Sequence, residues 1–80
     1  MTRDDLLKLI RDILADLTDQ DKLEITEATV ADDVSDWDSI NHVRLLLGLE
    51  SELGIRFETD TVSGADNVGA LIDLIQTQLT

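Results

Sequence analysis

Three segments of this chain repeat their apolar residues at steps of three and four positions, and this spacing constrains the fold more than any other feature. It is the period of an α-helix that buries one face. Alternation of the kind a β-strand needs appears only at residues 55–57, which is too short for a sheet. The sequence therefore predicts an all-α fold. The repeating residues are Leu6, Leu7, Ile10, Ile13, Leu14 and Leu17 near the start, Leu45, Leu46, Leu49 and Leu53 in the middle, and Val68, Leu71, Ile72, Ile75 and Leu79 near the end.

The first helix is expected to begin after Thr2 and to be followed by a long connection. Thr2 is a good N-cap, and Asp4 and Asp5 place negative charge where a helix N-terminus favours it. Residues 18–37 show no helical period. A connection of this length is usually functional or disordered, but its isolated apolar residues favour a packed loop with room for a short helical turn. These residues are Leu23, Ile25, Val30 and Val34.

The second helix is predicted to begin at Asp38 or Ser39 and to end just before Gly54, which supplies the stop. Asp66 is expected to cap the last helix, and residues 60–63 are expected to form one helical turn before it. Three main helices and one short helix, with a long first loop, predict a small four-helix bundle.

The charge of the chain excludes several classes of function. It has 80 residues with 18 acidic and 6 basic side chains, which leaves a net charge of −12. This excess argues against binding to nucleic acid or to an anionic membrane surface. The length predicts a single domain over residues 1–80, which we expect to be a monomer. We recognise neither a signal peptide nor a membrane span, which favours a cytoplasmic location.

The second helix carries more apolar residues than a small bundle needs. At about 100° per residue, Ile40, Val43 and Leu47 gather on nearly the opposite side from the leucines that face the core. A helix on the surface of a bundle needs one apolar face. The second stripe is therefore either a docking surface for another protein or, for Val43 and Leu47, a face that packs under the long loop.

The sequence contains no motif that favours catalysis or metal binding by this chain. Ser39, His42 and Asp38 contain the residue types of a serine triad, but no G-x-S-x-G turn or sheet is present to hold them. The aspartates before the second helix fail the calcium-loop pattern, since Asn41 stands at its glycine position. With one histidine and no cysteine, a transition-metal site is not expected either. The chain is predicted to be neither an enzyme nor a metal protein.

Ser39 is the remaining candidate for chemistry, because it stands where the second helix begins. Backbone N–H groups and the helix dipole favour a phosphate group at such a position. The dipeptide Asp38-Ser39 is equally typical of an ordinary N-cap. The same position also suits a serine that carries a covalent phosphodiester, because the cap points outward at the end of the bundle.

The segment Asp36-Trp37-Asp38-Ser39-Ile40, together with the helix that follows it, resembles the acyl carrier protein family. The resemblance extends to the length, the acidity, the long first loop and the last helix. It implies that Ser39, within its Asp38-Ser39 motif, receives 4'-phosphopantetheine from coenzyme A through a phosphopantetheinyl transferase. The thiol of that arm then holds an acyl group as a thioester, which accounts for a carrier without cysteine.

The resemblance also implies partners: an enzyme that loads the acyl or aminoacyl group, and downstream synthase or transferase enzymes. They are expected to dock on the helix after Ser39. Family members that serve fatty-acid synthesis often have acids where this chain has Asn41 and Arg44, and this difference favours a discrete carrier with dedicated partners. The expected partner-binding residues are Ile40, Asn41, Val43, Arg44, Leu47 and Glu50.

Two alternatives stay open. The chain is an aminoacyl carrier if a dedicated adenylating ligase loads it. It is an unmodified acidic helical adaptor if the second apolar stripe alone binds a partner and Ser39 is dispensable.

Overall fold

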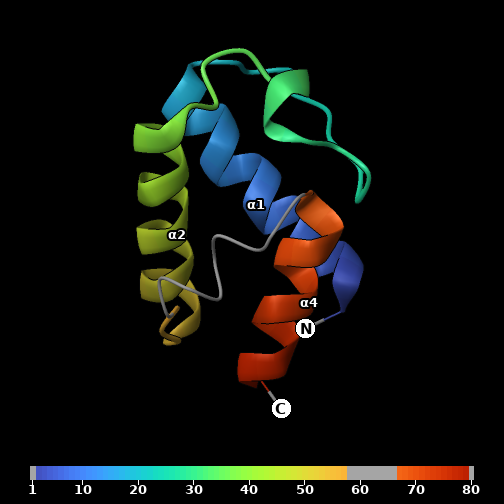
Figure 1. Ribbon diagram of the computed structural model, residues 1–80, viewed down its shortest axis with the longest axis vertical. Helices are drawn as coiled ribbons and strands as arrows, with labels where there is room; N and C mark the ends of the chain where they lie inside the picture. Colours follow the sequence, from blue (N-terminus) through green and yellow to red (C-terminus); the bar gives the residue numbers. More distant parts are fainter. Residues whose placement is uncertain (1, 58–66, 80) are drawn as a thin grey trace.

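The three periodic segments form three α-helices in the computed structural model, which describes residues 2–57 and 67–79. The first connection contains a short 3₁₀ turn, and the described part of the chain has no strand. Figure 1 shows the helices side by side, with the first loop crossing one end of the bundle. The all-α prediction is therefore confirmed. The elements are α1 (Arg3–Thr18), η1 (Ala31–Asp33), α2 (Ser39–Leu53) and α4 (Val68–Leu79).

Helix α1 begins with a reciprocal cap, as expected from Thr2. The Thr2 hydroxyl accepts the Asp5 N–H, and the Asp5 carboxylate accepts the Thr2 N–H, both at 3.1 Å. These bonds to its charged form hold the pKa of Asp5 below its usual value. Two donors without intrahelical partners are thereby satisfied.

The core lies between the three helices and is built almost entirely from Leu, Ile and Val. From α1, Leu6, Ile10 and Leu14 are buried at steps of four residues. The predicted stripe also included Ile13 and Leu17, but these are only half-buried. They lie toward the outer side of the contact with α2, so the fully buried face of α1 is narrower than the apolar pattern. The other buried apolar residues are Val34, Trp37, Leu45, Leu49, Val68, Leu71, Ile72 and Ile75.

The long first loop is held against α4 by backbone hydrogen bonds. The N–H groups of Val68 and Gly69 donate to the carbonyls of Thr29 and Glu27, at 2.9 and 2.7 Å. These N–H groups stand in the first turn of α4, where no helix carbonyl can reach them. Loop carbonyls thus accept hydrogen bonds from the N–H groups at the start of α4. The prediction of a packed loop is confirmed.

Asn67 caps α4 from the side chain. Its Oδ1 accepts the Ala70 N–H at 2.8 Å, in the turn where α4 begins. The expected cap, Asp66, lies outside the described residues, as does the helical turn expected at 60–63.

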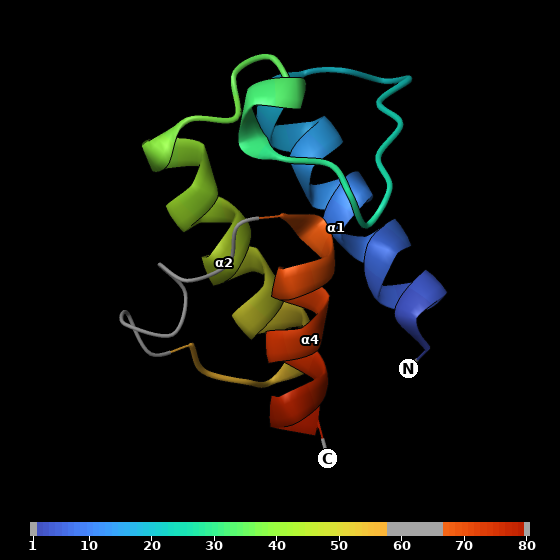
Figure 2. The ribbon, with the colours of Figure 1, turned by 45° about the vertical axis from the view of Figure 1, so that its right-hand side comes forward.

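The arrangement leaves the start of α2 at one end of the molecule. Both views show the first loop crossing the end of the bundle where α1 stops and α2 begins, with the N- and C-termini toward the other end (Figures 1 and 2). No helix in the described part of the chain is both long enough and apolar enough to cross a membrane.

Candidate functional site

The site is the beginning of α2, where the first loop ends. Helix α2 starts at Ser39, and Asp38 is its N-cap. The Asp38 carboxylate accepts the Asn41 N–H at 2.8 Å, and the Asp38 carbonyl accepts the His42 N–H at 2.8 Å. The N–H groups of Ser39 and Ile40 stand in the first turn, where a helix offers no acceptor. The predicted start of the helix is confirmed.

A tight turn at Asp36 directs the chain into α2. Asp36 has a φ of 67°, in the left-handed region that few residues other than glycine adopt readily. Its carbonyl accepts the Asp38 N–H at 3.0 Å and the Asn41 side-chain Nδ2 at 2.7 Å. Asn41 thus closes the turn from within the helix. The turn therefore places an aspartate at a position whose backbone conformation favours glycine.

Trp37 and His42 form the inner side of the site. Trp37 is buried at 8% exposure, and its indole N–H donates to Nδ1 of His42 at 3.2 Å. The two rings are stacked with centroids 6.0 Å apart. Burial lowers the pKa of His42 below its ordinary value of 6.5, so the ring is held neutral near pH 7. His42 is a partly buried histidine at the helix start.

This geometry disagrees with a catalytic triad. In a triad, Nδ1 of the histidine donates to a carboxylate, whereas Nδ1 of His42 accepts a hydrogen from Trp37. The Asp38 carboxylate is engaged by the Asn41 backbone. Among residues 2–57 and 67–79, no group of three or more His, Cys, Asp or Glu side chains is arranged to hold a metal ion.

The second apolar stripe of α2 faces solvent. Ile40, Val43 and Leu47 are 64%, 55% and 58% exposed. The alternative that Val43 and Leu47 pack under the long loop is therefore wrong, because the loop turns toward α4 instead. We call these three residues the α2 row. Unpartnered large apolar side chains in contiguous positions are typical of a binding surface.

The polar residues around the α2 row divide into two groups. Arg44 is exposed. Glu50, by contrast, is half-buried, and its carboxylate accepts the Phe57 N–H at 2.9 Å. Asn41 is also half-buried and holds the Asp36 turn. Asn41 and Glu50 thus have structural contacts that sequence reasoning did not foresee, and their binding to partners stays a prediction.

Sequence reasoning also missed the ion-pair network that holds the loop. Arg3 donates from Nε to the Glu27 carboxylate at 3.1 Å and pairs with Asp73 on α4. Its guanidinium lowers the pKa of Glu27. Separations of 24 and 70 positions give no local signal for such pairs.

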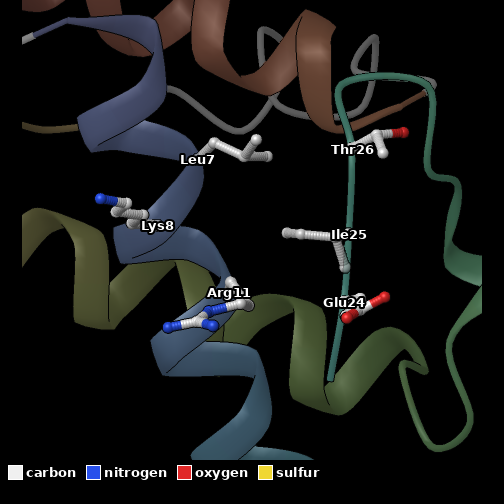
Figure 3. Close-up of a pocket in the computed structure, with 6 residues that line it drawn as sticks. All are labelled: Leu7, Lys8, Arg11, Glu24, Ile25 and Thr26. Carbon is white, nitrogen blue, oxygen red and sulfur yellow. The ribbon is translucent and has the colours of Figure 1, made fainter. Parts of the chain in front are cut away.

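Among the described residues, one open hollow lies on the loop side of α1 and another on its α2 side. One, of about 330 Å³, lies between α1 and the first loop, and in Figure 3 Ile25 points from the loop toward α1 near Leu7. The other, of about 560 Å³, lies between α1 and α2. Neither is lined by Ser39, Asp38 or Trp37.

The start of α2 suits an attached phosphodiester group. Its first turn presents backbone N–H groups and the positive end of the helix dipole, both of which favour an anion. Asp38 and Ile40 on either side of Ser39 are exposed. Serine is also a residue type whose oxygen forms a phosphate ester. The residues present therefore fit a phosphopantetheine group.

Comparison with known proteins identifies the family. Residues 8–75 match the family model described as phosphopantetheine attachment site. The chain is 31% identical over 80 residues to an acyl carrier protein of Petrotoga mobilis, covering 99% of this chain and 93% of that one. It is 33% identical over 76 residues to an acyl carrier protein of Lactobacillus acidophilus, covering 95% of each.

Solved structures agree with these relatives. The solution structure of a holo acyl carrier protein from Geobacter metallireducens is similar with a TM-score of 0.83 and 32% identity, over 92% of this chain and 85% of that one. The crystal structure of an acyl carrier protein from Thermotoga maritima is similar with a TM-score of 0.84 and 25% identity, over 96% and 89%. The chain therefore belongs to the acyl carrier protein family: it is a carrier rather than a catalyst, and phosphopantetheine is its cofactor.

Proposed function

We propose that Ser39 is the residue that carries the phosphopantetheine arm. The observation that supports this assignment is that α2 begins at Ser39, at one end of the bundle, with the α2 row starting at the next residue. A partner that covers the row therefore sits beside the attachment point. Ser35 and Ser51 are exposed serines, but neither stands in the first turn of a helix.

The chain contributes positioning rather than catalysis to this modification. Ser39 supplies the oxygen that forms the new phosphate ester and gives up its proton. The pyrophosphate bond of coenzyme A breaks and adenosine 3',5'-bisphosphate leaves, while a phosphopantetheinyl transferase supplies the catalytic groups. Asp38 fixes the first turn of α2 through the Asn41 N–H and so orients the helix start. When attached, phosphopantetheine supplies the thiol that holds an acyl group as a thioester.

The α2 row is proposed as the surface on which the enzymes that load and consume the cargo dock. Ile40, Val43 and Leu47 are apolar anchors of the kind that dominate binding energy. Truncating one of them to alanine is expected to weaken a partner by about 1–2 kcal/mol. Exposed Arg44 beside the row favours partners with a carboxylate at the matching place. Such a requirement points to dedicated partner enzymes.

The deciding experiment is intact mass spectrometry after incubation with coenzyme A, magnesium and a broad-specificity phosphopantetheinyl transferase. The expected result is a gain of one phosphopantetheinyl group in the wild-type chain and in Ser35→Ala, and no gain in Ser39→Ala. Ser35→Ala is the matched control, because it removes an exposed hydroxyl only four positions earlier in the chain. A gain in Ser39→Ala would move the attachment to another residue.

A second experiment tests the α2 row as a docking surface and compares the carrier with an unmodified adaptor. Leu47→Ala is expected to raise the KM of the transferase with little change in kcat, because Leu47 is exposed and its loss removes only a docking contact. Circular dichroism on each variant checks that the helices are retained. A folded wild-type chain that several transferases leave unmodified would favour the adaptor.

A further inference from the structure

The hollow of about 560 Å³ between α1 and α2 lies directly beside the α2 row, and we call it the α1–α2 groove. Its apolar lining comes from α1, where Leu9, Ile13 and Leu17 are half-buried rather than buried. On α2, Gly48 has no side chain to fill the groove, and a Cβ there would lie 3.4 Å from Ile13. The groove therefore leaves apolar surface of α1 accessible beside Gly48 of α2.

The groove and the α2 row form one continuous surface. Around α2, Arg44 and Ser51 are offset from Leu47 by about 60° and 40° in the same direction, at 100° per residue. Both residues line the groove. Along the axis of α2, its lining from Arg44 to Glu52 extends from about 8 to about 20 Å beyond Ser39. A protein seated on the row is thus in position to reach the groove as well.

The charged residues at the rim of the groove indicate the chemistry of a partner that could bind there. Its rim carries three exposed carboxylates, Asp12, Asp16 and Glu52, and one exposed guanidinium, Arg44. Asp12 pairs with its neighbour Arg11. Within the described part of the chain, Asp16, Glu52 and Arg44 make no ion pair. The rim is therefore net negative around an apolar floor, which suits an apolar side chain flanked by basic ones.

A second copy of this chain is a poor occupant. Each copy carries a net charge of −12, so two copies repel each other at moderate salt. A basic amphipathic helix has the complementary arrangement, with apolar anchors for a groove and cations for its rim.

We infer that the α1–α2 groove is a second docking surface of this carrier and receives a basic amphipathic helix of a partner enzyme. This inference rests on the proposed function and extends it, because it gives α1 a direct role in partner recognition. Leu9, Ile13 and Leu17 contact the apolar side chains of the partner, and Asp16 and Glu52 contact its basic side chains.

The test is an NMR titration of the ¹⁵N-labelled full chain with a synthetic amphipathic helical peptide made of leucine and lysine. The expected result is that the amide shifts of Leu9, Ile13 and Leu17 change, and that a peptide with glutamate in place of lysine has no effect. Shifts confined to the α2 row would overturn the inference. Dimerisation of the chain alone in sedimentation would assign the groove to a second copy and would also overturn it.

Matched charge variants make the test specific to the groove. Asp16→Asn with Glu52→Gln is expected to weaken the leucine–lysine peptide about fivefold. Asp21→Asn with Glu24→Gln changes the net charge equally, at exposed positions outside the groove, and is expected to leave the affinity nearly unchanged. Equal weakening by both pairs would show attraction to the net charge alone. A larger effect of the second pair would place the peptide at the hollow of Figure 3, which Glu24 lines.

A filled groove gives an independent check. Ser51→Tyr adds bulk at an exposed lining position without changing the charge, and it is expected to weaken the same peptide while the helices are retained. Unchanged affinity would contradict the inference. The mass-gain experiment on the wild-type chain tests Ser39 separately, so either proposal is able to fail without the other.

Discussion

The indole N–H of Trp37 donates to Nδ1 of His42 at 3.2 Å, and this bond joins the end of the first loop to the first turn of α2. The bond requires Nδ1 to be unprotonated. Protonation of His42 therefore breaks a contact beside the attachment position, and burial opposes that protonation. The bond makes the stability of the start of α2 depend on pH near neutrality.

We predict that the wild-type chain loses stability as the pH falls below about 6.5, the ordinary pKa of histidine, and that His42→Asn loses less. The pKa of His42 is lowered in the folded state from 6.5, so the unfolded chain binds this proton first as pH falls. The loss begins below the unfolded pKa and is complete below the folded one. The asparagine side chain of the variant keeps an acceptor for Trp37 without titrating. Urea unfolding, followed by the fluorescence of Trp37, the one tryptophan, measures the free energy of unfolding of both proteins at each pH. Equal losses in the two proteins would exclude His42 as the cause.

Removal of the α2 cap is predicted to destabilise the fold. Asp38→Ala leaves the Asn41 N–H without its side-chain acceptor, which costs about 1 kcal/mol. Asp38→Asn retains an accepting oxygen and is the matched control, with a change of only a few tenths of a kcal/mol expected. Denaturant midpoints of the three proteins decide the matter. An alanine variant as stable as the wild-type chain would mean that solvent caps the helix equally well.

Replacement of Gly69 by alanine is predicted to destabilise the fold. A Cβ there would lie 3.0 Å from the Glu27 carbonyl oxygen, which is backbone and accepts the Gly69 N–H. Gly69→Ala is expected to lose about 1–3 kcal/mol and to speed hydrogen exchange of the Val68 amide. Gly48→Ala is the control, because its Cβ would meet only the Ile13 side chain at 3.4 Å. That change is expected to be neutral or to stabilise α2 by up to about 1 kcal/mol. Equal effects of the two would contradict the steric argument.

The turn at Asp36 is predicted to prefer glycine. Asp36→Ala places an ordinary side chain at a φ of 67° and is expected to lower the melting temperature, by an amount that corresponds to about 1 kcal/mol. Asp36→Gly removes the Cβ and is expected to melt at or above the wild-type temperature. Thermal unfolding by circular dichroism compares them. A glycine variant less stable than the alanine variant would show that the turn does not impose the left-handed conformation.

Much of the fold was predictable because its signals are local. The capping box at Thr2, the start of α2 at Ser39 and its stop at Gly54, with a φ of 66°, each depend on residues within one helical turn. Helical periodicity likewise indicated that α2 has a second apolar face. The local patterns placed Ser39 at a helix start, and the resemblance to the acyl carrier protein family implied that it is the attachment position.

Other features were not predictable because the contacts that create them join distant parts of the chain. Periodicity grouped Ile13 and Leu17 with the core, but the crossing of α1 and α2 leaves them half-buried beside the groove. Nothing near Glu50 indicated that its carboxylate would hold the Phe57 N–H. No local pattern indicated that carbonyls of the first loop would accept the first N–H groups of α4.

The sequence by itself determined the helices, their ends and the position of Ser39, because short-range hydrogen bonding and helical period act within a few residues. Only the tertiary structure decided which apolar residues are left uncovered. Val43 and Leu47 are exposed because the loop is held to the start of α4 by Gly69 and to the start of α1 by the pairing of Arg3 with Glu27, across 24 positions of sequence. Burial depends on what packs over a side chain, and that is a property of the whole fold.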